Sequence, residues 1–192
     1  MDKFKNIYRI PSARAQWWNY GNNAAYFITI CTAYREEFFG NVINKKMQLS
    51  PIGVIADVFW HEIKKHFNNI ELREFVVMPN HIHGILVINK QQPSNVTPVE
   101  TRHALSHTAQ KPQSPGQQRI RNQGENTISS VIGGYKSVVT NHVRRLGYDF
   151  KWQSRFHDHI IEDELEYQRI ADYIIENPKN WENDKFYTNK QI

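Results

Sequence analysis

The chain has 192 residues, 40% of them hydrophobic, and carries a formal net charge of +5 with an isoelectric point of about 9.3. This length predicts a single domain over residues 1–192 with a sizeable core, and the charge is compatible with a polyanionic partner without naming one. The single cysteine, Cys31, excludes a disulfide framework and a cysteine-based zinc site. Because the sequence shows neither a signal-peptide pattern nor a membrane span, we expect a cytoplasmic protein that contacts no membrane.

Strand and helix patterns alternate in the first part of the chain. Residues 24–34 are rich in β-branched and aromatic side chains and predict a strand, and a second strand is expected near residues 38–48. Ser50 and Pro51 then mark the start of a helix, because serine favours the N-cap and proline the first helical position. Apolar residues recur at helical spacing as far as Phe67, where the helix is expected to end.

Two further strand patterns follow this helix. Residues 72–78 and 81–89 are expected to pair through a short turn at Pro79 and Asn80. Their apolar content on both faces predicts a central pair of strands that is covered by helices. This order of elements predicts an α+β fold, a ferredoxin-like sandwich with a central antiparallel sheet and helices packed on it.

The composition changes after this pair of strands, where polar residues, proline and glycine dominate. We expect a flexible insertion over residues 91–126. His103 and His107 have the i, i+4 spacing of a helical metal site. They lie in sequence that predicts disorder, which argues against such a site.

Ordered patterns return in the last third of the chain. A helix is expected over residues 127–146 and a short strand over residues 155–161. Asp163 can cap a last helix, with Glu166 three residues later as its capping-box partner. This helix is expected to run to about Asn177, before a proline that stops it.

Two histidines open the strand pattern of residues 81–89. Because successive side chains of a strand point to opposite faces, His81 and His83 share one face. Two neutral imidazoles at this spacing can bind the same divalent ion. They can equally be a buried pair that is hydrogen-bonded to the backbone, and the H-x-H pattern alone does not decide between the two interpretations.

The last predicted helix carries Tyr173 and Asn177 on one face, one turn apart. A tyrosine phenolate can attack phosphorus and form a covalent phosphotyrosine, and an amide oxygen is a hard ligand for a divalent metal. Alternatively, Tyr173 is a packing aromatic residue and Asn177 is a helix C-cap. Tyr135 is a rival nucleophile because it lies on a basic helix, although its apolar neighbours favour packing.

Three motifs stand out in combination. They are VVMPNHIHGI at 76–85, WQSRFHDHII at 152–161 and ADYIIENPKNW at 171–181. Together they resemble the HUH single-strand endonucleases, specifically the REP-associated tyrosine transposases among the single-tyrosine transposases. The resemblance extends over most of the chain outside residues 91–126, and the combination is far more specific than any one motif.

The resemblance implies a metal-dependent single-strand DNA endonuclease and strand transferase, a transposase that acts on hairpin-associated DNA. His81 and His83 would bind Mg²⁺ or Mn²⁺, and Asn177 falls where this family has its third ligand. Tyr173 would be the nucleophile and would leave a 5′-phosphotyrosine beside a free 3′-hydroxyl. Relatives act as single chains or as homodimers that exchange helices, and the sequence does not decide between a monomer and a homodimer.

Other residues fit roles around this centre. His159 falls at a family-like position and would support the metal ligands. The candidates for DNA binding, through phosphate contacts or base stacking, are Arg155, Trp152, Lys136, Arg144, Arg145 and Arg14. Two alternative functions stay open: a domesticated protein that binds hairpin DNA or RNA without cleaving it, and a metal phosphohydrolase that uses water instead of Tyr173.

Overall fold

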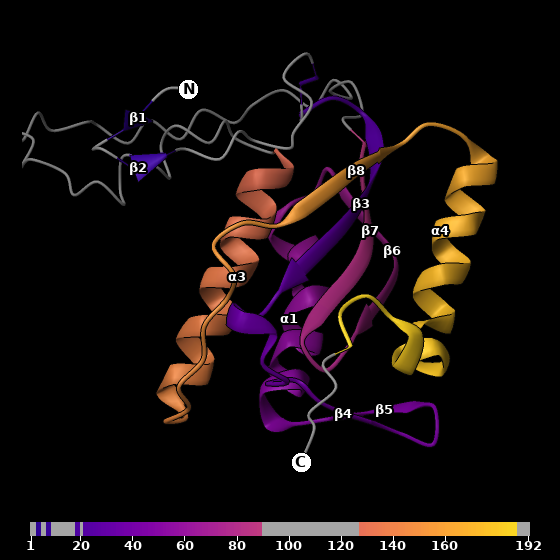
Figure 1. Ribbon diagram of the computed structural model, residues 1–192. Coiled ribbons are helices and arrows are strands. Elements are labelled where there is room, and N and C mark those ends of the chain that lie inside the picture. The colour runs from indigo at the N-terminus through magenta and orange to yellow at the C-terminus, as the bar shows by residue number, and fades with distance from the viewer. Residues whose placement is uncertain (1–2, 5–6, 9–17, 20, 90–126, 188–192) are drawn as a thin grey trace, which may run out of the picture.

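A four-stranded antiparallel sheet forms the centre of the computed structural model, which describes residues 3–4, 7–8, 18–19, 21–89 and 127–187 (Figure 1). In their order across the sheet, its strands are β6 (Ile70–Val77), β7 (His81–Ile88), β3 (Ala24–Cys31) and β8 (His157–Ile161). Along the chain, β3 and β6 flank α1 (Pro51–His66), and β7 and β8 flank α3 (Ile128–Arg145). This β-α-β-β-α-β order confirms the predicted ferredoxin-like α+β sandwich.

Helices cover both faces of the central sheet. α1 and α3 pack on one face, and α4 (Glu164–Glu176) packs on the other (Figure 1). Alternate residues of β7 point to opposite faces of the sheet. Ile82 and Leu86 pack in the core under α1 and α3, whereas Ile85 packs against α4. His81 and His83 have the same parity as Ile85 and therefore face the α4 layer.

Close packing of α1 on β7 depends on Gly84. The indole of Trp60 is fully buried over this position and stacks on the ring of Phe75 at a centroid distance of 5.2 Å. A Cβ atom at residue 84 would come within 2.3 Å of Cζ2 of Trp60. Glycine therefore lets the helix approach the strand that carries the two histidines.

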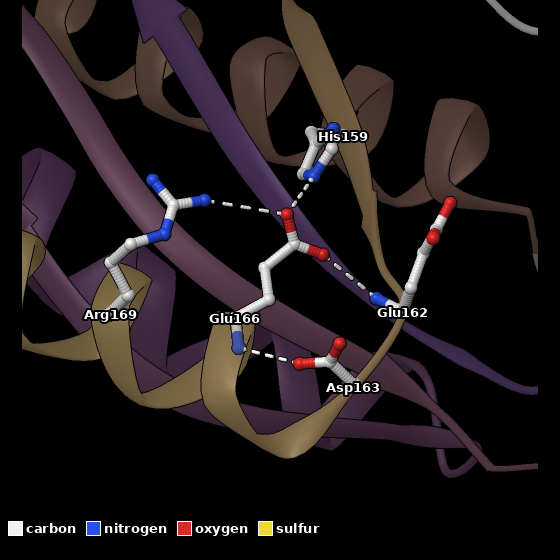
Figure 2. Close-up of polar contacts among 5 residues, drawn as sticks. All are labelled: His159, Glu162, Asp163, Glu166 and Arg169. Atoms are coloured by element: carbon white, nitrogen blue, oxygen red, sulfur yellow. Dashed lines mark hydrogen bonds and ion pairs between the residues drawn. The ribbon is translucent and has the colours of Figure 1, made fainter.

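The helix boundaries follow the predicted capping residues. The Ser50 side chain accepts a hydrogen bond from the N–H of Gly53 at 3.1 Å, and α1 begins and ends as the sequence predicts. At the start of α4, the Asp163 side chain accepts from the N–H of Glu166 at 2.8 Å (Figure 2). The Glu166 carboxylate accepts from the N–H of Glu162 at 2.9 Å, one residue before the cap, so the predicted capping box is displaced by one residue.

The first predicted strand, residues 24–34, is shorter than expected and ends at Cys31. A single 3-10 turn follows, η1 (Ala33–Arg35). In this turn Tyr34 and Arg35 have positive φ angles of 55° and 58°, which a strand does not allow. The prediction from β-branched and aromatic content was therefore wrong for residues 32–34, which are not part of the strand.

The strand expected near residues 38–48 is instead a hairpin. It consists of β4 (Gly40–Ile43) and β5 (Lys46–Leu49) and forms a two-stranded sheet outside the central one (Figure 1). Asn44 and Lys45 connect the strands with positive φ angles of 51° and 62°, the conformation of a tight hairpin turn. The turn lacks the usual Asn-Gly pair, which explains why the sequence pattern did not reveal it.

Beyond α4 the chain turns back toward the start of β7. A 3-10 segment, η2 (Asn177–Asn183), replaces the α-helix where proline follows, and β8 begins at His157 rather than at residue 155. Trp181 and Phe186 pack with Met78, the residue that ends the β6 side of the Pro79–Asn80 connection. The rings of Trp181 and Phe186 also lie beside the two histidines.

Some predictions concern residues outside the described ranges. These are the insertion at 91–126 with His103 and His107, and Arg14. Near the N-terminus, β1 (Lys3–Phe4) and β2 (Ile7–Tyr8) pair in antiparallel fashion. None of the helices in the described part of the chain combines the length and apolar character that a membrane span requires.

Candidate metal and tyrosine site

His81 and His83 lie at the start of β7, which pairs with β3 on one side and β6 on the other. Both side chains are fully buried, and their ring centroids are 4.4 Å apart. Their cross-strand partners on β3 are Cys31 and Thr29. Because a central strand fixes the direction of its side chains, both imidazoles are held toward the α4 layer.

Asn80 determines which nitrogen of His81 is free. The Asn80 side chain is fully buried, and its Nδ2 donates to the carbonyl oxygens of Phe186 at 2.8 Å and Arg35 at 3.2 Å. Its Oδ1 therefore faces Nδ1 of His81, 2.9 Å away, and Nδ1 must carry the proton that it donates. The other nitrogen, Nε2, is buried without a hydrogen-bond partner and presents a lone pair. An oriented imidazole with a free lone pair is the form that binds a metal ion.

His83 joins β3 to α4. Its Nδ1 lies 2.9 Å from Oγ1 of Thr29, and its Nε2 lies 3.2 Å from the hydroxyl of Tyr173. The Thr29 hydroxyl can accept from Nδ1–H, which leaves the lone pair of Nε2 on the side of Tyr173. Burial lowers the pKa of His83 well below its ordinary value and lowers the pKa of His81 to about 3. Both imidazoles are therefore neutral at physiological pH, as metal ligands must be.

Tyr173 reaches this pair from α4. Ile170 and Ile174 bury the apolar side of the helix against the sheet, and the Tyr173 side chain stays 39% exposed beside them. Its hydroxyl lies 3.2 Å from Nε2 of His83 and donates to Oδ2 of Asp184 at 3.0 Å. Burial, followed by the charge of Asp184, raises the pKa of Tyr173 well above its ordinary value, so the phenol is protonated in this state.

Asp184 lies beside Tyr173, Asn177 and the two histidines, and the sequence did not predict it there. Besides the Tyr173 hydroxyl, its Oδ2 accepts from Nδ2 of Asn177 at 3.0 Å. Ligand atoms of His81, His83 and Asp184 all lie within 4.8 Å of one another. No periodicity or motif spacing points to Asp184, because only the turn of the chain through η2 brings it back to β7.

Unpaired atoms around this cluster fit a divalent cation. Nε2 of His81 and Oδ1 of Asn177 are buried and have no hydrogen-bond partner among the described residues. Both atoms are acceptors, and a cation satisfies such lone pairs without a donor. Two imidazole nitrogens with a carboxylate and an amide oxygen form a donor set suited to divalent ions. The structure thus brings Asn177, the predicted third ligand, to the site and adds Asp184 to it.

The chain is similar in sequence to a bacterial protein and in fold to a solved transposase structure. No family model matches the chain. The chain is 36% identical over 183 residues to an uncharacterized protein of Haemophilus influenzae, and the match spans 94% of each chain. The two proteins belong to one family. Among solved structures, a REP-associated tyrosine transposase bound to a REP hairpin aligns with a TM-score of 0.54 and 17% identity, over 88% of this chain and 74% of that one. This family therefore has the fold of that transposase, as the three motifs predicted.

Two of the predicted DNA-binding residues contact each other next to β8. Nζ of Lys136 donates to the carbonyl of Gln153 at 2.5 Å and lies 5.7 Å from the centroid of the Trp152 ring. Burial lowers the pKa of Lys136 to about 8. The Trp152 ring packs against Phe150 with the centroids 4.8 Å apart, and its Nε1 donates to the Lys136 carbonyl at 3.2 Å. Trp152 is half-buried and packs against Phe150 and Lys136, and its role in DNA binding stays a prediction.

The other predicted DNA-binding residues are spread over the surface. Arg155 is exposed in the segment that precedes β8. Arg144 and Arg145 are exposed at the end of α3, in the layer on the opposite face of the sheet from α4. The structure does not bring these two arginines to the face that carries the histidines.

His159 and Tyr135 have partners of their own. Nε2 of His159 lies 2.8 Å from Oε1 of Glu166 and joins β8 to the first turn of α4 (Figure 2). Tyr135 is buried in the core and donates from its hydroxyl to the carbonyl of Ala56 at 2.8 Å, and burial raises its pKa well above the ordinary value. Of the two candidate nucleophiles, Tyr173 is the one beside the histidines.

Proposed function

We propose that the protein is a metal-dependent endonuclease and strand transferase that cleaves hairpin-associated single-stranded DNA through a covalent tyrosine intermediate. The observation that supports this most directly is the position of the Tyr173 hydroxyl, 3.2 Å from Nε2 of His83 and 3.0 Å from Oδ2 of Asp184. A nucleophile, two neutral imidazoles and a carboxylate thereby meet in one place. This combination supplies a nucleophile and the metal donors that the proposed phosphoryl transfer to a tyrosine would use.

His81, His83 and Asp184 are the proposed holders of the divalent ion, with Asn177 as a further oxygen donor. The acceptor atoms without partners, on His81 and Asn177, support this assignment. Mg²⁺ or Mn²⁺ bound there supplies positive charge that polarises the scissile phosphate and offsets the charge of the Asp184 carboxylate.

In the proposed step, the phenolic oxygen of Tyr173 forms a bond to phosphorus while the bond from phosphorus to the 3′ oxygen breaks. The phenolic proton moves to Oδ2 of Asp184, to which the hydroxyl already donates, and the departing 3′ oxygen takes a proton from water. The products are a 5′-phosphotyrosine and a free 3′-hydroxyl. Because the intermediate is still a phosphodiester, the 3′-hydroxyl of another strand can attack it, rejoin the DNA and release Tyr173.

One chain is sufficient for the proposed chemistry. Within the described residues, α4 packs on the sheet of its own chain and places Tyr173 against His83 there. No exchange of α4 between two chains is therefore required. We propose that the protein cleaves DNA as a monomer, whatever its state of association when it binds two DNA ends.

Hairpin DNA with a single-stranded extension is the proposed substrate. The solved transposase with this fold is bound to a REP hairpin, and we extend that class of partner to the present chain. The net charge of +5 agrees with a polyanionic partner.

Covalent trapping tests the proposal. Hairpin oligonucleotides from the genome that encodes the protein, labelled at the 3′ end, are incubated with the protein and Mn²⁺ and separated under denaturing conditions. Wild-type protein should form a labelled adduct, because the strand on the 3′ side of the nick stays attached through its 5′ phosphate. The same oligonucleotides labelled at the 5′ end should release a free labelled product.

Two tyrosine variants serve as comparison. Tyr173→Phe should form no adduct, whereas Tyr148→Phe, at an exposed tyrosine beyond α3, should form it at the wild-type level. An adduct in Tyr173→Phe would refute the nucleophile. Wild-type protein that binds the hairpins tightly and forms no adduct with any of them would favour the alternative of a binding protein without cleavage.

A further inference from the structure

The turn between β3 and β4 has an unfavourable backbone conformation that no hairpin connection requires. Tyr34 and Arg35 have φ angles of 55° and 58°, a region that costs free energy for residues other than glycine. Asn44 and Lys45 also have positive φ angles, but they form the tight turn of the β4–β5 hairpin, which requires them. No hairpin requires them at Tyr34 and Arg35.

Hydrogen bonds from neighbouring segments hold this turn in place. The N–H of Ala33 donates to the carbonyl of Lys151 at 2.9 Å, and the Thr32 N–H donates to the carbonyl of Asn80 at 2.9 Å. The Asn80 side chain in turn donates to the carbonyl of Arg35 at 3.2 Å. The residue that orients the His81 imidazole therefore also fixes the turn, and strained backbone held in this way is typical of functional sites.

The Tyr34 side chain projects from this turn into solvent. It is 90% exposed, so burial in the protein does not account for its position. Exposed aromatic rings beside nucleic-acid sites bind unpaired bases by stacking, because every base has a flat π-face.

Two cations lie beside the same turn. The Arg35 guanidinium donates to the carbonyl of Lys185 at 3.1 Å, and its Cζ lies 4.9 Å from the centroid of the Phe186 ring. Nζ of Lys185 lies 4.9 Å from that centroid as well. The Phe186 ring is 4.5 Å from the ring of His81, so one aromatic ring separates both cations from the proposed metal site.

We propose that Tyr34, Arg35 and Lys185 form a nucleotide-binding subsite for the single-stranded DNA that flanks the cleaved phosphate. Tyr34 stacks on one unpaired base, and Arg35 and Lys185 bind the adjoining phosphates. The fixed backbone of the turn presents the ring and the guanidinium before DNA arrives, which reduces the entropy lost on binding. The subsite rests on the proposed function only in that single-stranded DNA enters the site at His81 and His83.

Binding without cleavage tests the stacking contact. Fluorescence anisotropy is measured in EDTA with a labelled single-stranded oligonucleotide and with a series in which one base at a time is removed. Tyr34→Ala should weaken binding about 5-fold or more, within the range for one base–aromatic stack, while Tyr34→Phe should stay within about 2-fold of wild type. For the oligonucleotide that lacks the stacked base, wild type and Tyr34→Ala should bind equally.

Salt dependence tests the phosphate contacts. Arg35→Gln and Lys185→Gln should each make the negative slope of log K against log salt less steep by about 0.7, the value for one phosphate of a single strand. Lys65→Gln removes the same charge from α1, where Lys65 pairs with Glu62 at 2.7 Å, and should leave the slope unchanged.

The outcomes separate the subsite from the catalytic proposal. The subsite would be overturned, and tyrosine chemistry left standing, if Tyr34→Ala bound every oligonucleotide like wild type. It would also be overturned if the salt dependence became less steep by the same amount in Lys65→Gln and Lys185→Gln. Wild-type protein that binds no single-stranded DNA would overturn both. Thermal denaturation should show Tyr34→Ala as stable as wild type, because the ring is exposed and alanine keeps the same backbone restriction.

Discussion

Removing the Asn80 side chain should weaken both folding and metal binding. This side chain is fully buried and makes three hydrogen bonds, to the Arg35 carbonyl, the Phe186 carbonyl and Nδ1 of His81. In Asn80→Ala, two carbonyl oxygens and one imidazole N–H lose their partner. The α4 face of β7 would then carry an imidazole that is free to rotate and to change its tautomer.

The expected size of the effect follows from these contacts. Each buried polar group that loses its partner lowers the free energy of unfolding by about 1–3 kcal/mol. The Arg35 carbonyl contributes least, because it lies in an exposed turn where water can replace the lost hydrogen bond. The free energy of unfolding should therefore fall by about 2–6 kcal/mol, the sum for the two buried partners, which leaves a domain in the middle of the ordinary range of about 5–15 kcal/mol folded. Loss of the group that orients a metal-bound histidine lowers metal affinity by roughly 10–100-fold, and the same range is expected here.

Urea denaturation and calorimetric titration with Mn²⁺ measure the two effects separately. Asn80→Asp is the informative comparison, because aspartate keeps an oxygen acceptor for Nδ1 of His81 but cannot donate to the two carbonyls. It should lose stability like Asn80→Ala and keep most of the Mn²⁺ affinity. Equal Mn²⁺ affinity in wild type and Asn80→Ala would refute the argument that Asn80 prepares His81 for a metal.

Two further predictions concern the metal donors and their protonation. Asp184→Asn should lower the Mn²⁺ affinity by about 10-fold or more in the same titration. Asp172→Asn, at an exposed position on α4, should leave the affinity unchanged. Equal losses in the two variants would exclude Asp184 as a ligand. Lowering the pH from 7 to 5 should reduce the free energy of unfolding by about 2 kcal/mol through His81 alone, because its folded pKa of about 3 lies below the ordinary 6.5 and the unfolded chain takes up the proton first. Urea denaturation across this range measures the loss, and a His81→Asn variant with the full wild-type pH slope would contradict it.

Local patterns were sufficient to predict the central elements. Ser50 and Pro51 mark the start of α1, and Asp163 marks the start of α4, because capping residues act on the helix that directly follows them. The period of two along β7 predicted that His81 and His83 share a face, and the structure places both on the α4 side. These predictions depend on neighbours a few residues away, which the sequence displays directly.

The missed residues depend on contacts across the fold. Asp184 reaches His83 only because η2 turns back after α4, and nothing near residue 184 in the sequence encodes the end point of that turn. Asn80 was predicted only as a turn residue, since its role for His81 follows from carbonyls that lie 45 and 106 residues away in sequence. The positive φ angles of Tyr34 and Arg35 contradict the strand propensity of their segment, and tertiary hydrogen bonds override it.

Several features that oppose stability lie around the start of β7. Two neutral imidazoles are buried there, one with an unpaired lone pair, and the adjacent turn at Tyr34 and Arg35 holds an unfavourable backbone conformation. Asn80 connects the His81 imidazole to this turn and to Phe186 through its three hydrogen bonds. A region under selection for stability alone would fill this space with apolar side chains, as β7 does at Ile85 in the same layer. The proposed function accounts for this arrangement, because donors that are held in position before a cation and a phosphate bind need little rearrangement when they do.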